Sequence, residues 1–390
     1  MLTCQRHLFD LPTDEIYLNC ARRGPQTKRS TEIGIEVIRR QCQPTGYSNA
    51  DFFNIVQDIK QGFSDLVQAN DPERIAIIPS VSYGLANVAN NLNLKKGDQI
   101  IVAGKQFPSN VYAWSKQAEK AEAEMVFVDA PDTMNRGEAW NGAILAAIND
   151  RTRLVALGNV HWTDGTLFDL KAIRAKTSQY NALLVIDGTQ SIGALPFSVA
   201  EIQPDALITG GYKWMFGPYS LGLAYYGSAF DDGMPIEHSW INRRNSDDFS
   251  NLVNYQPEYR PKAARYSVGE QSNFILGPML LAAIEQLKNW GITNIQTYCQ
   301  RITEKPVAQL RDMGLWIEKD DFRSKHLFGV RLSDDFDGDL FKKALEAAKI
   351  SVSFRGTAVR IAPNVYNTEE ELWQLVDCFK RARKRALAIQ

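Results

Sequence analysis

The sequence has no excess of charge of either sign. Its 44 basic and 45 acidic residues leave a formal net charge of -1, so no long-range field draws the protein to nucleic acid or to an anionic membrane. No stretch of about 18 apolar residues occurs. The first residues, MLTCQRHLFDLPTDE, carry charges where a signal peptide needs an apolar core. We therefore expect no nucleic-acid partner, no membrane partner and no export signal.

Paired cysteines are also missing. The five cysteines are scattered, with no CxxC pair, at positions 4, 20, 42, 299 and 378. This spacing argues against a zinc knuckle and against a disulfide framework, and we expect no bound metal. Free thiols fit a reducing compartment, so the expected location is the cytoplasm.

What the sequence does contain is an alternation of short apolar runs with helical patterns. The runs are unbroken, which predicts strands whose two faces are both covered, and the α/β order predicts a mainly parallel sheet with crossover helices. An amphipathic helix is expected over residues 51–68, where apolar residues recur at helical spacing. The runs that we predict to be strands lie at 74–79, 99–104, 124–129, 153–160, 182–187, 206–211 and 222–227.

The chain is long enough for two domains. At 390 residues it exceeds what one simple core usually holds. After about Gly269 the pattern changes to a long helix, then to a helix-rich segment and a closing helix from about Thr368. We predict an α/β large domain over 21–270 with a mainly parallel seven-stranded sheet, and a smaller α+β C-terminal domain over 271–390. Residues 1–20 are expected to pack with the small domain.

Lys213 stands in the segment ITGGYKWMFGPYS, after an apolar run and two glycines. Aromatic neighbours would leave its amine poorly solvated, which lowers the pKa of a lysine and makes the amine nucleophilic. A lone lysine more often extends from a loop into solvent. Asp187, at the end of ALLVID, is a candidate partner, because a carboxylate there can pair with a cationic ring nitrogen. Asp before Gly is also a common turn former.

Two further strand ends carry groups that suit an anionic, aromatic ligand. The segment SVSYG at 80–84 joins a strand to a helix, and hydroxyls and free amides at a helix N-terminus suit a phosphate. Serine capping explains the same residues equally well. Phe107, in KQFPSN, is placed to cover one face of a flat ring, although an aromatic residue there is more often core.

Together, the four segments are stronger evidence for a cofactor site than any one of them alone. In chain order they provide a phosphate cradle, a ring cover, a partner for a ring nitrogen and a nucleophilic lysine. Each lies at the carboxyl end of a predicted strand, where ligands bind in open α/β sheets. Pyridoxal 5′-phosphate (PLP), held by Lys213 as a Schiff base, is a cofactor that uses all four.

On these residues the sequence resembles the aminotransferase class V superfamily of fold-type I PLP-dependent transferases. Cysteine desulfurases, selenocysteine lyases, isopenicillin N epimerase-like proteins and kynureninases belong to it. The segment 187–190 matches the D-x-x-Q motif, which implies that Gln190 lies beside the phenolic oxygen of PLP. Tyr212 with Lys213 resembles the kynureninase Tyr-Lys pair, whose tyrosine reaches the phosphate, and Phe107 matches the phenylalanine that stacks on PLP. The implied cofactor-binding set is Ser82, Tyr83, Phe107, Asp187, Gln190, Tyr212 and Lys213.

The resemblance also implies a substrate side. Arg360 matches the arginine that grips a substrate α-carboxylate, a task that suits a planar bidentate donor; a salt bridge within the strand is the ordinary alternative. His161 and Trp162 align with positions that line the substrate pocket in epimerase and kynureninase relatives. Asn19 resembles a residue of the amino-terminal segment that reaches the active site. Residues near Glu270–Ser272 match a region that touches the neighbouring subunit's phosphate, which implies a homodimer.

One departure from the family narrows the reaction. Cysteine desulfurases carry a nucleophilic cysteine shortly before the carboxylate arginine, whereas the segment SVSFRGTAVR has none. We therefore expect an enzyme that acts on a small amino acid by transamination or by C–S/C–C lyase chemistry, without forming a persulfide. An amino-acid epimerase resembling isopenicillin N epimerase and a non-catalytic PLP-fold binding protein are the alternatives.

Overall fold

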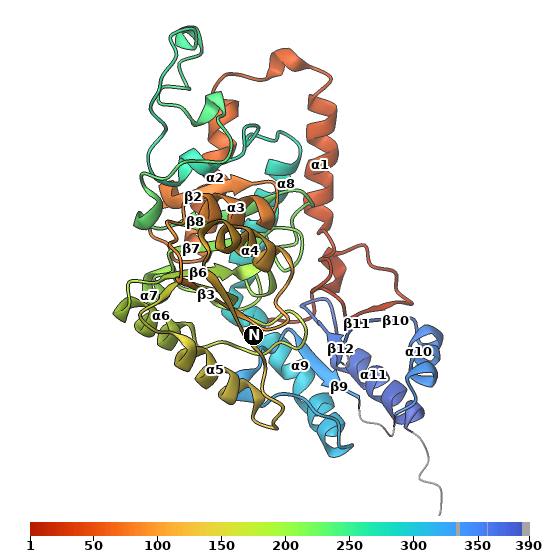
Figure 1. Ribbon diagram of the computed structural model, residues 1–390. Coiled ribbons are helices and arrows are strands. Elements are labelled where there is room, and N and C mark those ends of the chain that lie inside the picture. The colour runs from red at the N-terminus through yellow and green to blue at the C-terminus, as the bar shows by residue number, and fades with distance from the viewer. Residues whose placement is uncertain (333–335, 357, 384–390) are drawn as a thin grey trace, which may run out of the picture.

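A seven-stranded sheet forms the centre of the computed structural model, which describes residues 1–332, 336–356 and 358–383 (Figure 1). The strand order is β2-β8-β7-β6-β5-β3-β4, and all neighbours pair in parallel except β8, which is antiparallel to β2 and β7. Every run that was predicted as a strand is one, and the prediction of a mainly parallel sheet is confirmed. The strands are β2 (Ile75–Ile78), β3 (Gln99–Ala103), β4 (Glu124–Val128), β5 (Thr152–Gly158), β6 (Leu183–Asp187), β7 (Ala206–Gly210) and β8 (Gly222–Tyr226).

Both faces of this sheet are apolar. Successive residues of a strand point to opposite sides, so one apolar strand contributes to the core on both faces. Val102 and Ile208 belong to one buried cluster, whereas their neighbours Ile101 and Leu207 belong to the other. The first cluster includes residues of α3 (Val81–Asn90) and α4 (Ser109–Ala121). The second includes residues of α2 (Asp51–Leu66), α5 (Arg136–Ala147), α6 (Leu170–Gln179), α7 (Val199–Ile202) and α8 (Leu276–Trp290).

The prediction that both faces of the strands are covered is wrong for the edge strand β4. Its residues Glu124 and Phe127 are exposed, and Phe127 keeps half of its surface accessible. An edge strand has a neighbour on one side alone, so helices that cross the inner strands leave part of it open.

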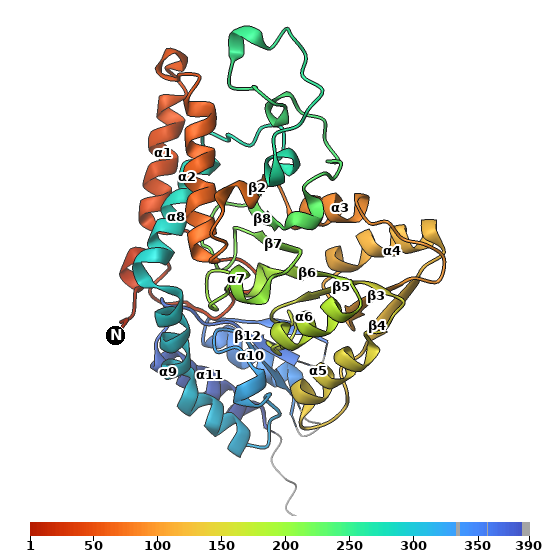
Figure 2. The same ribbon diagram turned by 90° about the vertical axis from the view of Figure 1, so that its left-hand side faces the viewer.

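Helix α8 packs beside α1 (Lys28–Arg40) and α2, and Figure 2 shows the three helices side by side. The hydroxyl of Ser30 donates to the backbone carbonyl of Met279 at 3.0 Å. The predicted helix over 51–68 is α2, and the long helix expected after residue 269 is α8. The boundary at 270/271 would therefore separate α8 from the two helices that it contacts, and the division into domains stays a prediction.

The C-terminal elements form a second, antiparallel sheet with the order β11-β12-β9. The N-terminal residues join the same part of the chain in a separate two-stranded sheet, in which β1 (Ile16–Tyr17) pairs in parallel with β10 (Ile350–Ser351). The side chain of Thr368 caps the last helix in a capping box with Glu371. Residues 384–390 of the predicted small domain lie outside the described residues. The remaining elements are α9 (Ile292–Asp312), β9 (Phe328–Arg331), α10 (Gly338–Ala347), β11 (Ser353–Arg355), β12 (Ala358–Ile361) and α11 (Glu369–Ala382).

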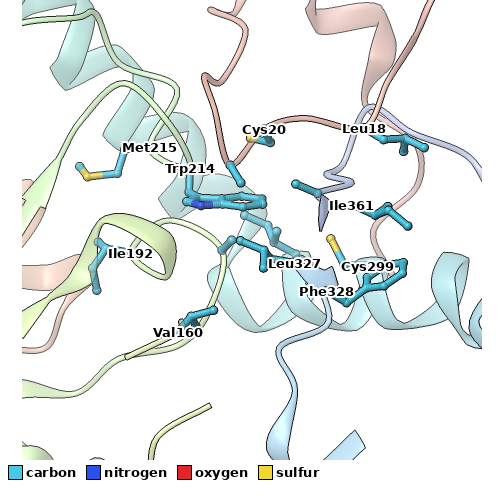
Figure 3. Packing of buried hydrophobic residues seen from close by; sticks show 14 of the residues in the cluster. Leu18, Cys20, Val160, Ile192, Trp214, Met215, Cys299, Leu327, Phe328 and Ile361 are labelled. Atoms are coloured by element: carbon cyan, nitrogen blue, oxygen red, sulfur yellow. The ribbon is translucent and has the colours of Figure 1, made fainter. Parts of the chain in front are cut away.

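The chain segments converge around Trp214, which follows the candidate lysine. Figure 3 shows Cys20 of the N-terminal segment, Leu327 and Ile361 near this ring, and all of them belong to one buried cluster. Gly24 brings the N-terminal segment against the lysine loop: a Cβ added there would lie 2.0 Å from the carbonyl oxygen of Lys213. Glycine is therefore required for this close approach.

Within the described residues, no helix is both long and apolar enough to cross a membrane. In the same ranges, no group of three or more His, Cys, Asp or Glu side chains is arranged to hold a metal ion.

Candidate active site

The carboxyl ends of the parallel strands open into a cavity of about 320 Å³, within the range of roughly 300–1,000 Å³ that is typical of small-molecule sites. Its walls come from the segments after β2, β3, β5, β6 and β7. The fold thus brings together most of the residues that the sequence singled out. The predicted residues that line the cavity are Ser82, Phe107, Trp162, Asp187, Gln190, Tyr212 and Lys213.

Lys213 is 7% exposed, and its Nζ makes no hydrogen bond or ion pair with any described residue. Burial lowers the pKa of this lysine to about 8, against the opposing attraction of Asp187. The Nζ atom lies 5.5 Å from the ring centroids of both Phe107 and Tyr212. A large fraction of the amine is therefore neutral near pH 8, which is the state of a nucleophile. Phe216, three residues later, has a φ of 56°, a strained backbone conformation of the kind found near functional sites.

Asp187 ends β6 beside the cavity. Its Oδ1 accepts the backbone N–H of Thr189 at 2.9 Å, which fixes the orientation of the carboxylate. Burial raises the pKa of Asp187, while the bonds from Thr189 and the charge of Lys213 act in the opposite direction. Since burial disfavours the lone anion, this carboxylate is suited to a cationic partner in the cavity.

Gln190 is held from three sides. Its Oε1 accepts the indole N–H of Trp214 at 2.9 Å, and its Nε2 donates to the backbone carbonyl of Ala21 at 3.1 Å. The backbone carbonyl of Gln190 lies 2.8 Å from Nε2 of His326, whose other ring nitrogen lies 2.9 Å from Nε2 of Gln296. Burial lowers the pKa of His326 to about 4. The imidazole is therefore neutral, and a donor at Nε2 with an acceptor at Nδ1 satisfies both neighbours.

The start of α3 forms one end of the cavity. Ser80 is the N-cap, and its Oγ accepts the backbone N–H of Tyr83 at 3.2 Å. The Oγ of Ser82 donates to Oγ of Ser109, 3.0 Å away, which joins α3 to α4. Because the first N–H groups of a helix have no acceptor within it, this end presents donors and a positive dipole to a ligand.

Aromatic rings form another part of the wall. Phe107 and Trp162 meet edge to face with centroids 5.5 Å apart, and the indole N–H of Trp162 donates to the carbonyl of Lys105 at 2.8 Å. Gln106 lines the same wall; its Oε1 accepts the N–H of Phe107, while its buried Nε2 has no partner among the described residues.

Arg360 lies behind Trp162 and is 1% exposed. Its Nη1 donates to the carbonyl of Trp162 at 2.9 Å, whereas Nε and Nη2 have no partner among the described residues. Burial, and secondarily the charge of Arg355, lower the pKa of Arg360 to about 9. The N–H groups of Nε and Nη2 lie on one edge of the guanidinium, and a carboxylate can accept from both of them.

Besides Arg360, three further predicted residues do not line the cavity. The hydroxyl of Tyr83 donates to Oε2 of Glu237 at 2.9 Å. Asn19 accepts the hydroxyl of Ser353 at 2.7 Å. The ring of His161 packs against Trp140 with centroids 4.8 Å apart, because it points to the side opposite its neighbours, which face the cavity. Their predicted roles stay predictions.

The structure adds cavity residues that sequence reasoning missed. Thr189 lies inside the D-x-x-Q turn, and its polarity was a usable signal. Ser109 follows the Phe107-Pro108 pair but lies 27 residues from Ser82, so their contact has no local sequence signal. Further additions are Gln106, Tyr219 and Ser220.

Comparisons with known proteins show which family the chain resembles. The profile of the aminotransferase class-V family matches residues 44–375. An uncharacterized aminotransferase of Bacillus subtilis (strain 168), YcbU, is 25% identical over 316 residues, which cover 81% of this chain and 80% of that protein. Kynureninase of Bacillus thuringiensis subsp. konkukian (strain 97-27) is 25% identical over 411 residues, which cover 98% of this chain and 94% of that protein.

A solved structure shares the fold. A variant of C-DES with glycine covalently linked to its PLP cofactor has a TM-score of 0.85 and 19% identity, and the match covers 96% of this chain and 98% of that chain.

Proposed function

The chain belongs to the aminotransferase class-V family and is a PLP-dependent enzyme, and from this premise we propose that Lys213 binds PLP covalently and that the enzyme acts on a small amino acid. The proposed reaction is transamination or cleavage of a C–S or C–C bond. One observation carries the proposal: a buried lysine without a partner shares a cavity with the buried carboxylate of Asp187.

The residues present fit this cofactor. Ser82 and the first amides of α3 would hold the phosphate, because they offer hydroxyl and N–H donors at a helix N-terminus. Phe107 would cover one ring face. Asp187 and Gln190 would meet the ring edge, since Asp187 requires a cation and Gln190 keeps an amide hydrogen free after its bond to Ala21.

PLP, when bound, draws electrons from the Cα atom of the substrate through its protonated ring nitrogen. Asp187 supports this by keeping the proton on that nitrogen. Lys213 has a lowered pKa of about 8, so its amine is available first as a nucleophile and then, once released, as the base that takes the Cα proton. Arg360 orients the substrate because its free Nε and Nη2 can bind the α-carboxylate.

A persulfide-forming reaction is outside the proposal. Among the residues that line the cavity there is no cysteine. Cys20 lies close to the lysine, but its Sγ contacts the Lys213 backbone carbonyl at 3.9 Å, and burial raises its pKa to about 12. This thiol therefore stays protonated and packs beneath the loop.

The proposal extends to assembly and location. A homodimer is proposed in which residues near Glu270–Ser272 approach the phosphate of the neighbouring subunit, and the proposed location is the cytoplasm. Within its own chain, the hydroxyl of Ser272 donates to the carbonyl of Phe52 at 2.6 Å.

Reduction with borohydride tests the assignment of Lys213. The purified protein, supplied with PLP, is expected to show a visible absorption band, and reduction should fix the cofactor on the peptide that contains Lys213, as read by mass spectrometry. Lys213→Ala should lose the band and lower kcat by about 1,000-fold or more, because nucleophile and base are removed together. Lys116→Ala, an exposed lysine on α4, is the matched control and should change neither.

A panel of L- and D-amino acids then separates the reactions. Release of a keto acid with amino transfer indicates transamination, and release of pyruvate, sulfide or an equivalent fragment indicates a lyase. Loss of optical rotation without release would assign the epimerase alternative instead. A colourless protein that takes up no PLP, or a label on a lysine other than Lys213, would overturn the proposal.

A further inference from the structure

Two arginines point to the same face of the β11–β12 hairpin. In its antiparallel register Arg360 pairs with Ser353, and Arg355 pairs with Ala358. Directly paired residues, and residues two apart on one strand, point to the same side of a sheet. Both arginines also contact Trp162: Nη1 of Arg360 bonds its carbonyl, and the guanidinium carbon of Arg355 lies 5.4 Å from its ring centroid.

A row of contacts joins Arg355 to the reactive lysine. Nζ of Lys213 lies 5.5 Å from the ring of Phe107, and the Phe107 ring lies 5.5 Å from that of Trp162. Arg355 packs on Trp162 in turn. Trp162 lines the cavity, so Arg355 lies next to this part of the cavity wall.

Neither arginine has an acidic partner. Within the described ranges, no carboxylate lies within 4.0 Å of Arg355 or Arg360, and the buried Nε of each is without a hydrogen-bond acceptor. Burial, and secondarily the charge of Arg22, lower the pKa of Arg355. Arg22 is exposed and makes no ion pair with the described residues. This end of the site therefore carries an excess of positive charge that no side chain of the described residues compensates.

One carboxylate does not satisfy this excess. The Nε and Nη2 edge of Arg360 matches the two oxygens of a single α-carboxylate. Arg355 is half-buried and its Nη1 donates to the backbone carbonyl of Phe354 at 2.7 Å, but its buried Nε still has no acceptor among the described residues. Leaving such a donor unsatisfied is unfavourable, so a second anionic group on the ligand accounts for what remains.

We propose that the substrate is an amino acid with an anionic side chain, which binds Arg355 while the α-carboxylate binds Arg360. The inference rests on the proposed function, because it places the substrate between Lys213 and these two arginines. Carboxylate and sulfinate side chains share the required chemistry, and the experiment below distinguishes them.

Binding of unreactive anions tests the second site without turnover. Glutarate and its half-amide glutaramate have nearly the same size and differ in one charge. Calorimetry on the PLP-loaded protein should give a glutarate affinity about 10-fold or more above that of glutaramate, as expected for one charge-assisted pair. Arg355→Gln should bring this ratio toward 1, and Arg355→Lys should restore part of it. Arg29→Gln, on the exposed face of α1, is the control and should leave the ratio unchanged.

Turnover gives the substrate class. The wild-type enzyme should prefer L-glutamate over L-glutamine or L-aspartate over L-asparagine in kcat/KM by about 10-fold or more, and L-cysteine sulfinate shows whether the sulfinate is preferred to the carboxylate. Equal kcat/KM values within each pair, on a protein whose Lys213 carries the cofactor, would overturn this inference and leave the proposed function intact. Failure of Lys213 to take up the cofactor would overturn the proposed function itself.

Discussion

Two buried arginines flank the loop that follows β5, and their surroundings differ. Arg136 is 5% exposed, and its Nη2 forms an ion pair with Asp164 at 3.1 Å. Arg360 is 1% exposed, and among the described residues its partner is the backbone carbonyl of Trp162. A buried charge without a counter-ion is unfavourable, whereas a paired one is tolerated. We therefore infer that Arg136 stabilises the fold, and we propose that Arg360 binds a ligand.

The partner of Arg136 supports this interpretation. Burial alone would raise the pKa of Asp164, but the hydrogen bonds and charges of His161, Arg136 and Thr166 bring it to about 2. Asp164 is therefore charged at neutral pH. Its backbone carbonyl also accepts the N–H of Gly329 on β9 at 2.9 Å, so this buried pair ties the loop after β5 to the C-terminal sheet.

Replacing each arginine by methionine gives the sharpest test of the contrast. Arg136→Met should lower the free energy of unfolding by about 3–5 kcal/mol, because it leaves Asp164 buried without its counter-ion. Arg360→Met should leave that free energy unchanged or raise it, because it removes a buried unpaired charge, while kcat/KM falls by roughly 30-fold or more. Urea denaturation and steady-state kinetics measure the two effects. Equal losses of stability in the two variants would remove the distinction.

The contrast between the two arginines could not be read from the sequence. Arg136 and Asp164 are 28 positions apart in chain order, on α5 and in a loop, and neither belongs to a motif. Arg360 was predicted through its resemblance to a carboxylate-binding arginine, yet its lack of an acidic partner depends on how the hairpin packs behind Trp162. Local patterns predict elements, whereas the pairing of buried charges is decided by tertiary packing.

The pH dependence of stability tests whether Lys213, like Arg360, is a buried basic group without a counter-ion among the described residues. Its pKa falls from 10.5 unfolded to about 8 in the fold, so between these values the unfolded chain binds the proton and the native state does not. Stability of the cofactor-free protein should therefore rise with pH over this interval, by about 3 kcal/mol. Lys213→Met removes the buried amine and should be more stable than wild type at pH 7, with the difference vanishing toward pH 10.5. A difference independent of pH between 7 and 10.5 would contradict the lowered pKa.

Much of the fold around Lys213 was predictable from the sequence, and the features that were not predicted have physical causes. All seven central strands were predicted from unbroken apolar runs. Such runs are typical of strands that are buried on both faces, although the edge strand β4 leaves Phe127 exposed. The direction of β8 was not, since its run, GLAYYG, reads like the parallel ones and direction depends on the connection before it. Gln190 was predicted from the D-x-x-Q motif. Its contact with His326 was not predictable, because the two residues are 136 positions apart in the sequence.

The smallest expected effect concerns how Gln190 is held. The indole N–H of Trp214 fixes the side-chain amide so that Oε1 faces the indole and Nε2 faces Ala21 and the cavity. Trp214→Phe keeps the aromatic packing and removes this donor, which costs about 1 kcal/mol and lets the amide turn. Cofactor affinity should then fall by roughly 5-fold, and the absorption band of the bound cofactor should shift or change its pH dependence, because a donor to the ring edge is lost.

Trp114 offers a matched control for this last variant. Its ring is equally buried and its indole N–H donates to Oδ1 of Asn110 at 3.0 Å, on the sheet face covered by α3 and α4. Trp114→Phe should lose a similar amount of stability, since it too leaves a side-chain oxygen without its donor. Its spectrum and cofactor affinity should match the wild type. Spectral changes of equal size in the two variants would mean that Trp214 acts through general packing, whereas a change confined to Trp214→Phe makes it a positioning residue for Gln190.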